Sequence, residues 1–186
     1  MEKNLKDIEL FLFDMDGTLY LGDNVYEGAI ELMNDLPKLG KKYIYLTNNS
    51  SRAGTDYITR LRRLGFPCEA ENVFTSGMAT GMYLNQRHPG AKVYLAGTKA
   101  FYRELVSYGI DLVNDENGHT DAETVDVVVQ GFDTELVYEK STRPATSCAA
   151  ARPLSLRTPT GSARCRMTRS CPTAAVFAPC SPLPAA

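Results

Sequence analysis

Two aspartates end the apolar run that opens the segment FLFDMDGTLYLGD, residues 11–23. Asp14 and Asp16 stand two positions apart, so in an extended backbone both side chains point to the same side. Two like charges about 4 Å apart repel by roughly 4 kcal/mol at an effective dielectric constant of about 20. A hard divalent cation such as Mg²⁺, which prefers oxygen ligands, offsets this repulsion. The pair therefore predicts a metal-assisted site at the end of a strand.

A second polar group follows the next apolar run along the chain. The segment TNNSS, residues 47–51, comes directly after KYIYL. Thr47 and Asn48 supply a hydroxyl and an amide, and a helix beginning after them adds the positive end of its dipole, so the group suits phosphoryl oxygens. Each motif alone is more often a turn or a helix cap. Both motifs at the ends of successive strands indicate a functional site.

The first 140 residues alternate between short apolar runs and amphipathic stretches, which predicts an α/β fold. Strands are expected at 8–14, 42–47, 72–76, 92–97 and 125–132, with helices between most of them. Such alternation implies parallel strands joined by right-handed crossovers. Ligands of these sheets bind beyond the carboxyl ends of the strands, where both polar groups fall.

The composition limits the class of protein. With 186 residues, of which 44% are hydrophobic, the chain can bury one ordinary globular core and a small second unit. No apolar run approaches the roughly 18 residues that a membrane span needs, and the N-terminus alternates charges where a signal peptide would be apolar. A net charge of −2 without a basic stripe argues against nucleic-acid binding. The sequence thus predicts a cytoplasmic protein with neither a membrane nor a nucleic-acid partner.

The last 46 residues are a different kind of sequence. Through Lys140 the chain carries 14 Lys and Arg against 22 Asp and Glu, whereas from Ser141 onward it carries six Arg, no Lys and no acid. The change falls inside DTELVYEK, residues 133–140, which reads as the first two turns of a helix that should continue. No helical or strand period follows it. Two explanations stay open: a slip of the reading frame in a G/C-rich gene near Lys140, or a native disordered tail.

The motifs DMDGTLYLGD and YLTNNSS, together with FTSGMATGMYL and VVVQGFDTELVYEK, resemble the haloacid dehalogenase superfamily of phosphohydrolases. The resemblance is to its capped subclass IIA, which includes 4-nitrophenylphosphatase-like and sugar or nucleotide phosphatase-like enzymes. It implies a three-layer Rossmann-like core, of which this chain holds the first half, and an incomplete α/β cap. The implied divisions are a core over 1–88, a partial cap over 89–140 and an anomalous tail over 141–186.

The resemblance also implies a role for each polar residue. Asp14 matches the nucleophile that forms an aspartyl phosphate, and Asp16 matches the general acid that later acts as general base. The Asp14 side chain and the Asp16 backbone carbonyl match ligands of Mg²⁺. Thr47 matches the group that binds the transferring phosphoryl, with Asn48 and Asn49 as its neighbours. The implied substrate is a small phosphorylated metabolite, and the implied assembly is a homodimer formed through the cap.

Two later elements of the family are missing. Family members carry a lysine that neutralises charge at the phosphate and an acidic Gly-Asp-type motif that completes the metal site, but no Lys, Asp or Glu occurs after Lys140. Lys92 and Lys99 are poor substitutes, since they fall in the expected cap. Two alternatives to an active phosphatase therefore stay open, an inactive fragment and a phospho-accepting or phosphate-binding module that does not turn over.

Other reactive side chains give weaker signals. His88 and His119 stand in turn-like contexts, and Cys68 reads as an ordinary reduced thiol. The cysteines of the tail form no C-x₂-C pair, so a zinc site is not expected. An incomplete sheet is expected to expose the apolar side chains of Phe11, Phe13 and Ile44.

The reading-frame hypothesis makes a direct prediction. One of the other two frames past codon 140 should encode the rest of an amphipathic helix, a lysine and a Gly-Asp motif, because the clean pattern stops within a helix. The nucleotide sequence over codons 138–186 checks this. If neither frame encodes these features, the tail is native.

Overall fold

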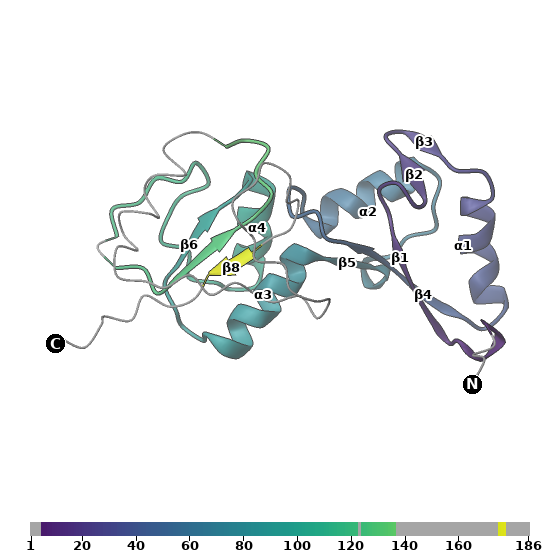
Figure 1. Ribbon diagram of the computed structural model, residues 1–186, viewed down its shortest axis with the longest axis horizontal. Helices are drawn as coiled ribbons and strands as arrows, with labels where there is room; N and C mark the ends of the chain where they lie inside the picture. The colour runs from purple at the N-terminus through teal and green to yellow at the C-terminus, as the bar shows by residue number, and fades with distance from the viewer. Residues whose placement is uncertain (1–4, 123, 137–174, 178–186) are drawn as a thin grey trace, which may run out of the picture. The chain divides into compact units, whose positions relative to one another are not determined.

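The computed structural model describes residues 5–122, 124–136 and 175–177, and the chain divides into two compact units (Figure 1). The first unit consists of Met1–Thr47 and Gly54–Thr75, and the second of Asn48–Ala53 and Ser76–Ala186. The segment Asn48–Ala53 therefore belongs to the second unit, although elements of the first unit precede and follow it. Apart from 175–177, the expected tail over 141–186 lies outside the described residues.

The first unit is built on a parallel sheet, as the sequence pattern predicted. Its described elements are η1 (Leu5–Asp7), β1 (Leu10–Asp14), β2 (Tyr20–Leu21), β3 (Asn24–Val25), α1 (Ala29–Lys38), β4 (Lys42–Thr47), α2 (Gly54–Arg63), η2 (Ala70–Asn72) and β5 (Val73–Thr75). The sheet has the order β1-β4-β5 with both neighbouring pairs parallel, and β2 and β3 form a separate antiparallel hairpin. Helices α1 and α2 make the two crossovers.

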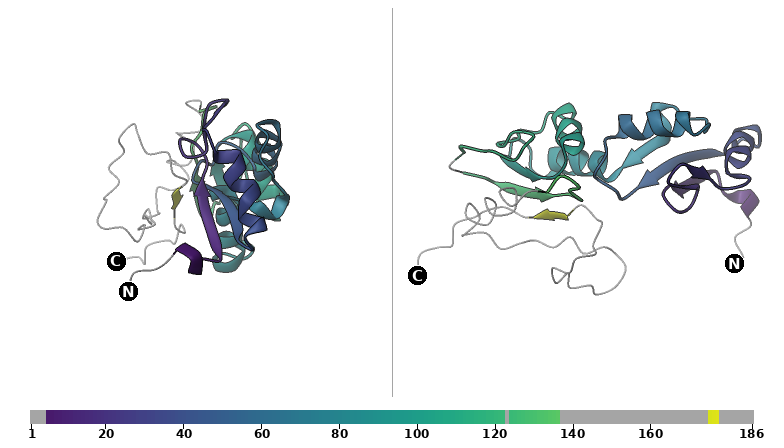
Figure 2. Two further views of the ribbon diagram at one scale, coloured as in Figure 1. Left: turned by 90° about the vertical axis from the view of Figure 1, so that its right-hand side faces the viewer. Right: turned by 90° about the horizontal axis from the view of Figure 1, so that it is seen from above.

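Both helices cover the same face of this sheet (Figure 2). The chain moves from β1 to β4 to β5 in one direction, so two right-handed crossovers place both helices on one side. Tyr43 and Tyr45 of β4 each donate a hydroxyl hydrogen bond to the carbonyl of Pro67, at 3.0 and 2.9 Å. These bonds tie the sheet to the segment that enters β5. The core cluster includes Met33, Leu36, Tyr43, Tyr45, Tyr57 and Leu61.

The opposite face of the sheet is apolar and open. Leu10, Leu12 and Leu46 are 47%, 60% and 37% exposed. The expectation that Phe11 and Phe13 would be exposed is wrong, since both are partly buried against the helix-covered core. Ile44, the third residue expected to be exposed, pairs with Leu12 in the row of the open face and is half-buried. In the described part of the chain, β1 pairs with β4 alone, so one edge of β1 is also free.

The second unit has a mixed sheet and two helices. Its described elements are α3 (Ser76–Arg87), β6 (Val93–Ala96), α4 (Lys99–Ser107), β7 (Val127–Gln130) and β8 (Ala175–Phe177). The sheet has the order β6-β7-β8, with β7 parallel to β6 and antiparallel to β8. Strand β8 comes from the tail, where the sequence showed no strand period. No helix in the described parts of either unit is long and apolar enough to cross a membrane.

Helices α3 and α4 approach closely because α3 carries glycine at the contact. A β-carbon added at Gly77 would meet the carboxylate of Glu104, and one added at Gly81 would meet the ring of Tyr108. Phe101 and Leu105 of α4 are buried, on the face that contacts the sheet and α3. The two glycines therefore let the sheet and both helices share one small core.

Two details of this unit concern helix faces and helix starts. Val106, next to the buried Leu105 of α4, is 50% exposed. Of the helix expected over 133–140, the structure describes residues 133–136, with a turn at 134–135 in which the Glu135 amide donates to the Asp133 carboxylate at 2.8 Å. A carboxylate that accepts from the amide two residues further on also caps the start of a helix. Residues 137–140 lie outside the described residues.

The two faces of the first sheet should respond differently to substitution. Leu12→Thr should change the thermal midpoint by only about 1 to 2 °C and reduce self-association, because Leu12 is largely exposed and threonine suits a strand. Leu61→Ala should cost about 2 to 5 kcal/mol, because Leu61 is fully buried. Thermal unfolding and light scattering of both variants check this. A large loss of stability in Leu12→Thr would mean that this face is covered.

Candidate active site

The two polar motifs lie at the ends of successive strands, and the structure shows that these strands are neighbours in the sheet. In the parallel register of β1 and β4, Asp14 pairs with Leu46, and Thr47 is the next residue of β4. Each of the two residues ends its strand, and the chain leaves the sheet beyond it. The first motif therefore stands beside the first residue of the second, at the edge where open parallel sheets bind ligands.

The loop after β1 presents both aspartates to solvent. Asp14 and Asp16 are exposed, whereas Met15 between them is fully buried. This alternation matches the expected direction of the two carboxylates. Met15 therefore anchors the loop in the core and leaves the acidic side chains outside.

A tight turn holds the backbone that follows Asp16. Gly17 has a φ of 84°, in the left-handed region that favours glycine, and its amide donates to the carbonyl of Tyr20 at 2.8 Å. The carbonyl of Met15 accepts from the amides of Thr18 and Leu19 at 3.2 and 3.0 Å. The Asp16 backbone is thus enclosed by hydrogen bonds made by residues on both sides of it.

No described cation neutralises the two carboxylates. Neither Asp14 nor Asp16 forms a salt bridge with a described residue, and Asp14 only accepts a long contact from the Thr18 hydroxyl at 3.5 Å. Mg²⁺ is commonly bound through one or two carboxylates and retains several waters, so this pair fits the ion as a partial donor set. The described residues include no group of three or more His, Cys, Asp and Glu that could complete it.

Thr47 lies on the opposite face of the sheet from Asp14. It is 4% exposed and pairs with the fully buried Thr75 of β5. In β4 it continues the buried row of Tyr43 and Tyr45, whereas Asp14 continues the exposed row of β1. The Thr47 side chain therefore lies on the buried face of the sheet, and the Asp14 side chain lies on the exposed face.

Asn48 and Asn49 belong to the second unit, together with the segment that follows them. The carbonyl of Asn48 accepts from the Ser76 hydroxyl at 3.0 Å, and the Asn49 side-chain oxygen accepts from the Ser51 amide at 2.9 Å. The buried Ser50 hydroxyl accepts from the amide of Phe132 at 2.8 Å. These contacts anchor the segment, and the Asn49 oxygen has a structural role in its turn.

The sequence motifs did not reveal the hairpin of β2 and β3 or the arginine that contacts it. The signal was present, because a Gly-Asp pair between two short extended segments is typical of a two-residue hairpin turn. Arg60 of α2 lies over the ring of Tyr20, with 5.1 Å from the guanidinium carbon to the ring centroid. Burial raises the pKa of Tyr20 to about 12, the charge of Asp16 raises it too, and the charge of Arg60 opposes both.

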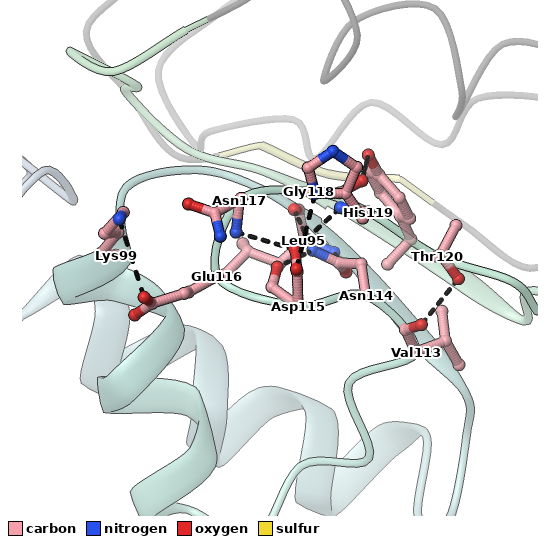
Figure 3. Close-up of polar contacts among 11 residues, drawn as sticks. Leu95, Lys99, Val113, Asn114, Asp115, Glu116, Asn117, Gly118, His119 and Thr120 are labelled. Atoms are coloured by element: carbon pink, nitrogen blue, oxygen red, sulfur yellow. Dashed lines mark hydrogen bonds and ion pairs between the residues drawn. The ribbon is translucent and has the colours of Figure 1, made fainter.

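A second polar cluster, the loop over 113–120, stabilises the second unit (Figure 3). The buried Asn114 side chain accepts from the amide of Leu95 at 2.7 Å and donates to its carbonyl at 3.0 Å, as a neighbouring strand would. The Asp115 carboxylate accepts from the amides of Asn117 and His119, and the His119 amide is the main cause of its lowered pKa. The hydrogen bonds of this loop therefore stabilise its own turn and the edge of β6.

The remaining reactive side chains have local partners. Lys99 lies 3.6 Å from the carboxylate of Glu116, as a surface lysine does, and Lys92 is exposed. His88 packs against the ring of Tyr83, with their centroids 5.7 Å apart. Cys68 is a free, buried thiol, and burial raises its pKa, which favours the protonated form.

Comparison with known proteins agrees with this arrangement. Residues 11–111 match the family model for haloacid dehalogenase-like hydrolases. An acid sugar phosphatase of Staphylococcus aureus is 34% identical over 136 residues, which are 73% of this chain and 50% of that protein. The chain thus spans about half the length of the curated relatives it matches.

Solved structures give the same result. The 4-nitrophenylphosphatase of Thermotoga maritima has a TM-score of 0.65 and 33% identity, over 77% of this chain and 51% of that chain. A double-mutant thermostable NPPase of Geobacillus stearothermophilus has a TM-score of 0.66 and 30% identity, over 83% of this chain and 60% of that chain. Because the family model covers more than half of the sequence and the D-x-D-G-T turn lies beside Thr47, the chain belongs to the haloacid dehalogenase-like hydrolases, in the capped subclass IIA.

Proposed function

We propose that this chain carries the nucleophile-bearing half of a Mg²⁺-dependent phosphomonoesterase that acts on a small phosphorylated metabolite. The observation that carries the proposal is the pair of exposed carboxylates in a tight turn at the end of β1, next to the end of β4. The names of the relatives, an acid sugar phosphatase and a 4-nitrophenylphosphatase, support a phosphate ester as substrate.

The proposed reaction has two steps. A carboxylate oxygen of Asp14 forms a bond to phosphorus while the ester bond to the leaving group breaks, and Asp16 gives its proton to the leaving alkoxide. Asp16 then takes a proton from water, which attacks the aspartyl phosphate and releases inorganic phosphate. Thr47 would bind the phosphoryl oxygens, with Asn48 and Asn49 as its neighbours in the motif. Mg²⁺, held by the Asp14 side chain and the Asp16 carbonyl, would offset the negative charge of the phosphoryl group.

Turnover by this chain alone is proposed to be weak. The lysine and the acidic motif of the family have no counterpart here, and deleting one electrostatic stabiliser costs roughly 3 to 4 kcal/mol. Two such losses, if additive, lower the rate by roughly 10⁴ to 10⁶.

We likewise propose a core over 1–88, a cap over 89–140, a homodimer formed through that cap and a cytoplasmic location.

Steady hydrolysis of 4-nitrophenyl phosphate tests the function and separates it from its alternatives. A phosphatase releases 4-nitrophenolate continuously. A phospho-accepting module of receiver type would be phosphorylated once per chain without turnover, and an inactive fragment would do neither.

Replacing the proposed nucleophile should abolish activity without unfolding the protein. Asp14→Asn should reduce turnover to background because it removes the attacking carboxylate, and it should leave the thermal midpoint unchanged or higher because it relieves repulsion with Asp16. Asp35→Asn is the matched control, since Asp35 is an exposed helix residue paired with Lys38. Unchanged turnover in Asp14→Asn would remove Asp14 from the mechanism.

Metal dependence gives a separate test. Excess chelator should abolish turnover, and Mg²⁺ should restore it better than Ca²⁺, because Mg²⁺ holds the tighter octahedral geometry. Calorimetric titration of Mg²⁺ should show weaker binding to Asp14→Asn than to Asp35→Asn, which tests the ligand without reference to activity. Full activity in excess chelator would contradict a metal-dependent mechanism.

A further inference from the structure

We propose that Arg60 is a positioning residue that holds the Asp16 loop in place through the β2–β3 hairpin. The inference rests on the proposed function only for the role of Asp16. The contacts themselves lie within the first unit and join residues that are distant in sequence.

One side chain holds the hairpin at three points. The Arg60 guanidinium donates to the carbonyl of Gly22 at 2.5 Å, stacks over the Tyr20 ring at 5.1 Å and lies 3.6 Å from the carboxylate of Asp23. Its side chain is 15% exposed. A planar guanidinium can make all of these contacts at once, which the point charge of a lysine cannot.

The hairpin in turn is bonded to the aspartate loop. Asp16 and Tyr20 form a β-bridge, and the Gly17 amide donates to the Tyr20 carbonyl at 2.8 Å. Tyr20 is fully buried beneath Arg60. A displacement of Tyr20 would therefore move the backbone on both sides of Asp16.

The Arg60 side chain reaches the hairpin through a largely buried position. Its Nε and the hydroxyl of Tyr20 beneath it are both buried. An apolar side chain on α2 could fill this space, but it could not donate to the carbonyl of Gly22 in the turn of the hairpin.

Arg63 provides a matched control. It also belongs to α2 and pairs with the same Asp23 carboxylate at 2.9 Å, but its side chain is 63% exposed. Solvent screens such a pair, and the described contacts of Arg63 include neither Tyr20 nor Gly22. Replacing Arg63 removes the same charge from the same helix and leaves the three-point contact of Arg60 in place.

Amide hydrogen exchange of the chain tests the positioning. Arg60→Met should speed exchange in a peptide covering 14–25 by about tenfold or more, Arg60→Lys by less, and Arg63→Met by less than about twofold, with β4 unchanged in all three. Two results would overturn the proposal: equal exchange of 14–25 in Arg60→Met and Arg63→Met, or an equal acceleration of β4, which would mean general destabilisation.

Kinetics on two esters tests the consequence for Asp16. An alkyl phosphate needs a proton on its leaving group, whereas 4-nitrophenolate leaves without one, and general acid catalysis is typically worth 10² to 10⁴ in rate. Arg60→Met should therefore lower kcat about tenfold more for the alkyl phosphate, with KM little changed. Equal losses for both esters would overturn a link to Asp16. Absence of turnover in the unmutated chain would instead refute the proposed function for this chain, and the exchange result would still decide whether Arg60 holds the loop.

Discussion

The parallel register of β1 on β4 is the constraint on which the rest of the first unit depends. It sets Asp14 beside Leu46 and so brings two motifs more than thirty residues apart to one edge of the sheet. The same register aligns Phe13 with Tyr45 on the face that α1 and α2 cover. A shift of one residue would turn Phe11 and Phe13 away from the helices and Asp14 toward them. The cost of burying the Asp14 carboxylate therefore opposes such a shift.

Much of this architecture could be predicted from periodicity. The strands that carry the motifs have short apolar runs bounded by polar residues, and their parallel direction follows from the helices between them. The open face was expected too, but on the wrong row of β1, since Leu10 and Leu12 are exposed and Phe11 and Phe13 are partly buried. A strand with apolar residues in both rows gives no sign of which row the helices cover. Only the packing of α1 and α2 decides between them.

Other features depend on tertiary contacts that a linear pattern does not contain. The role of Arg60 requires knowing that α2 lies over the hairpin, and Arg60, Arg62 and Arg63 look alike in the sequence. The bond from the Glu135 amide to the Asp133 carboxylate is likewise visible only in the folded chain. Strand β8 pairs with β7 from a part of the chain with no strand period, so its pairing partner, and not its own pattern, identifies it. The roles of Asp14, Asp16, Thr47, Asn48 and Asn49 in chemistry stay proposals.

The free edge of β1 has a dynamic consequence for the residue at its end. Within the described chain, the strand that carries Asp14 is held by one row of hydrogen bonds, from β4, where an interior strand would have two. Edge strands open locally at lower free energy than interior ones, because fewer contacts must break. Opening of this edge therefore contributes to the motion of the Asp14 carboxylate. A polypeptide that added a strand along this edge would restrict that motion without touching the carboxylate itself.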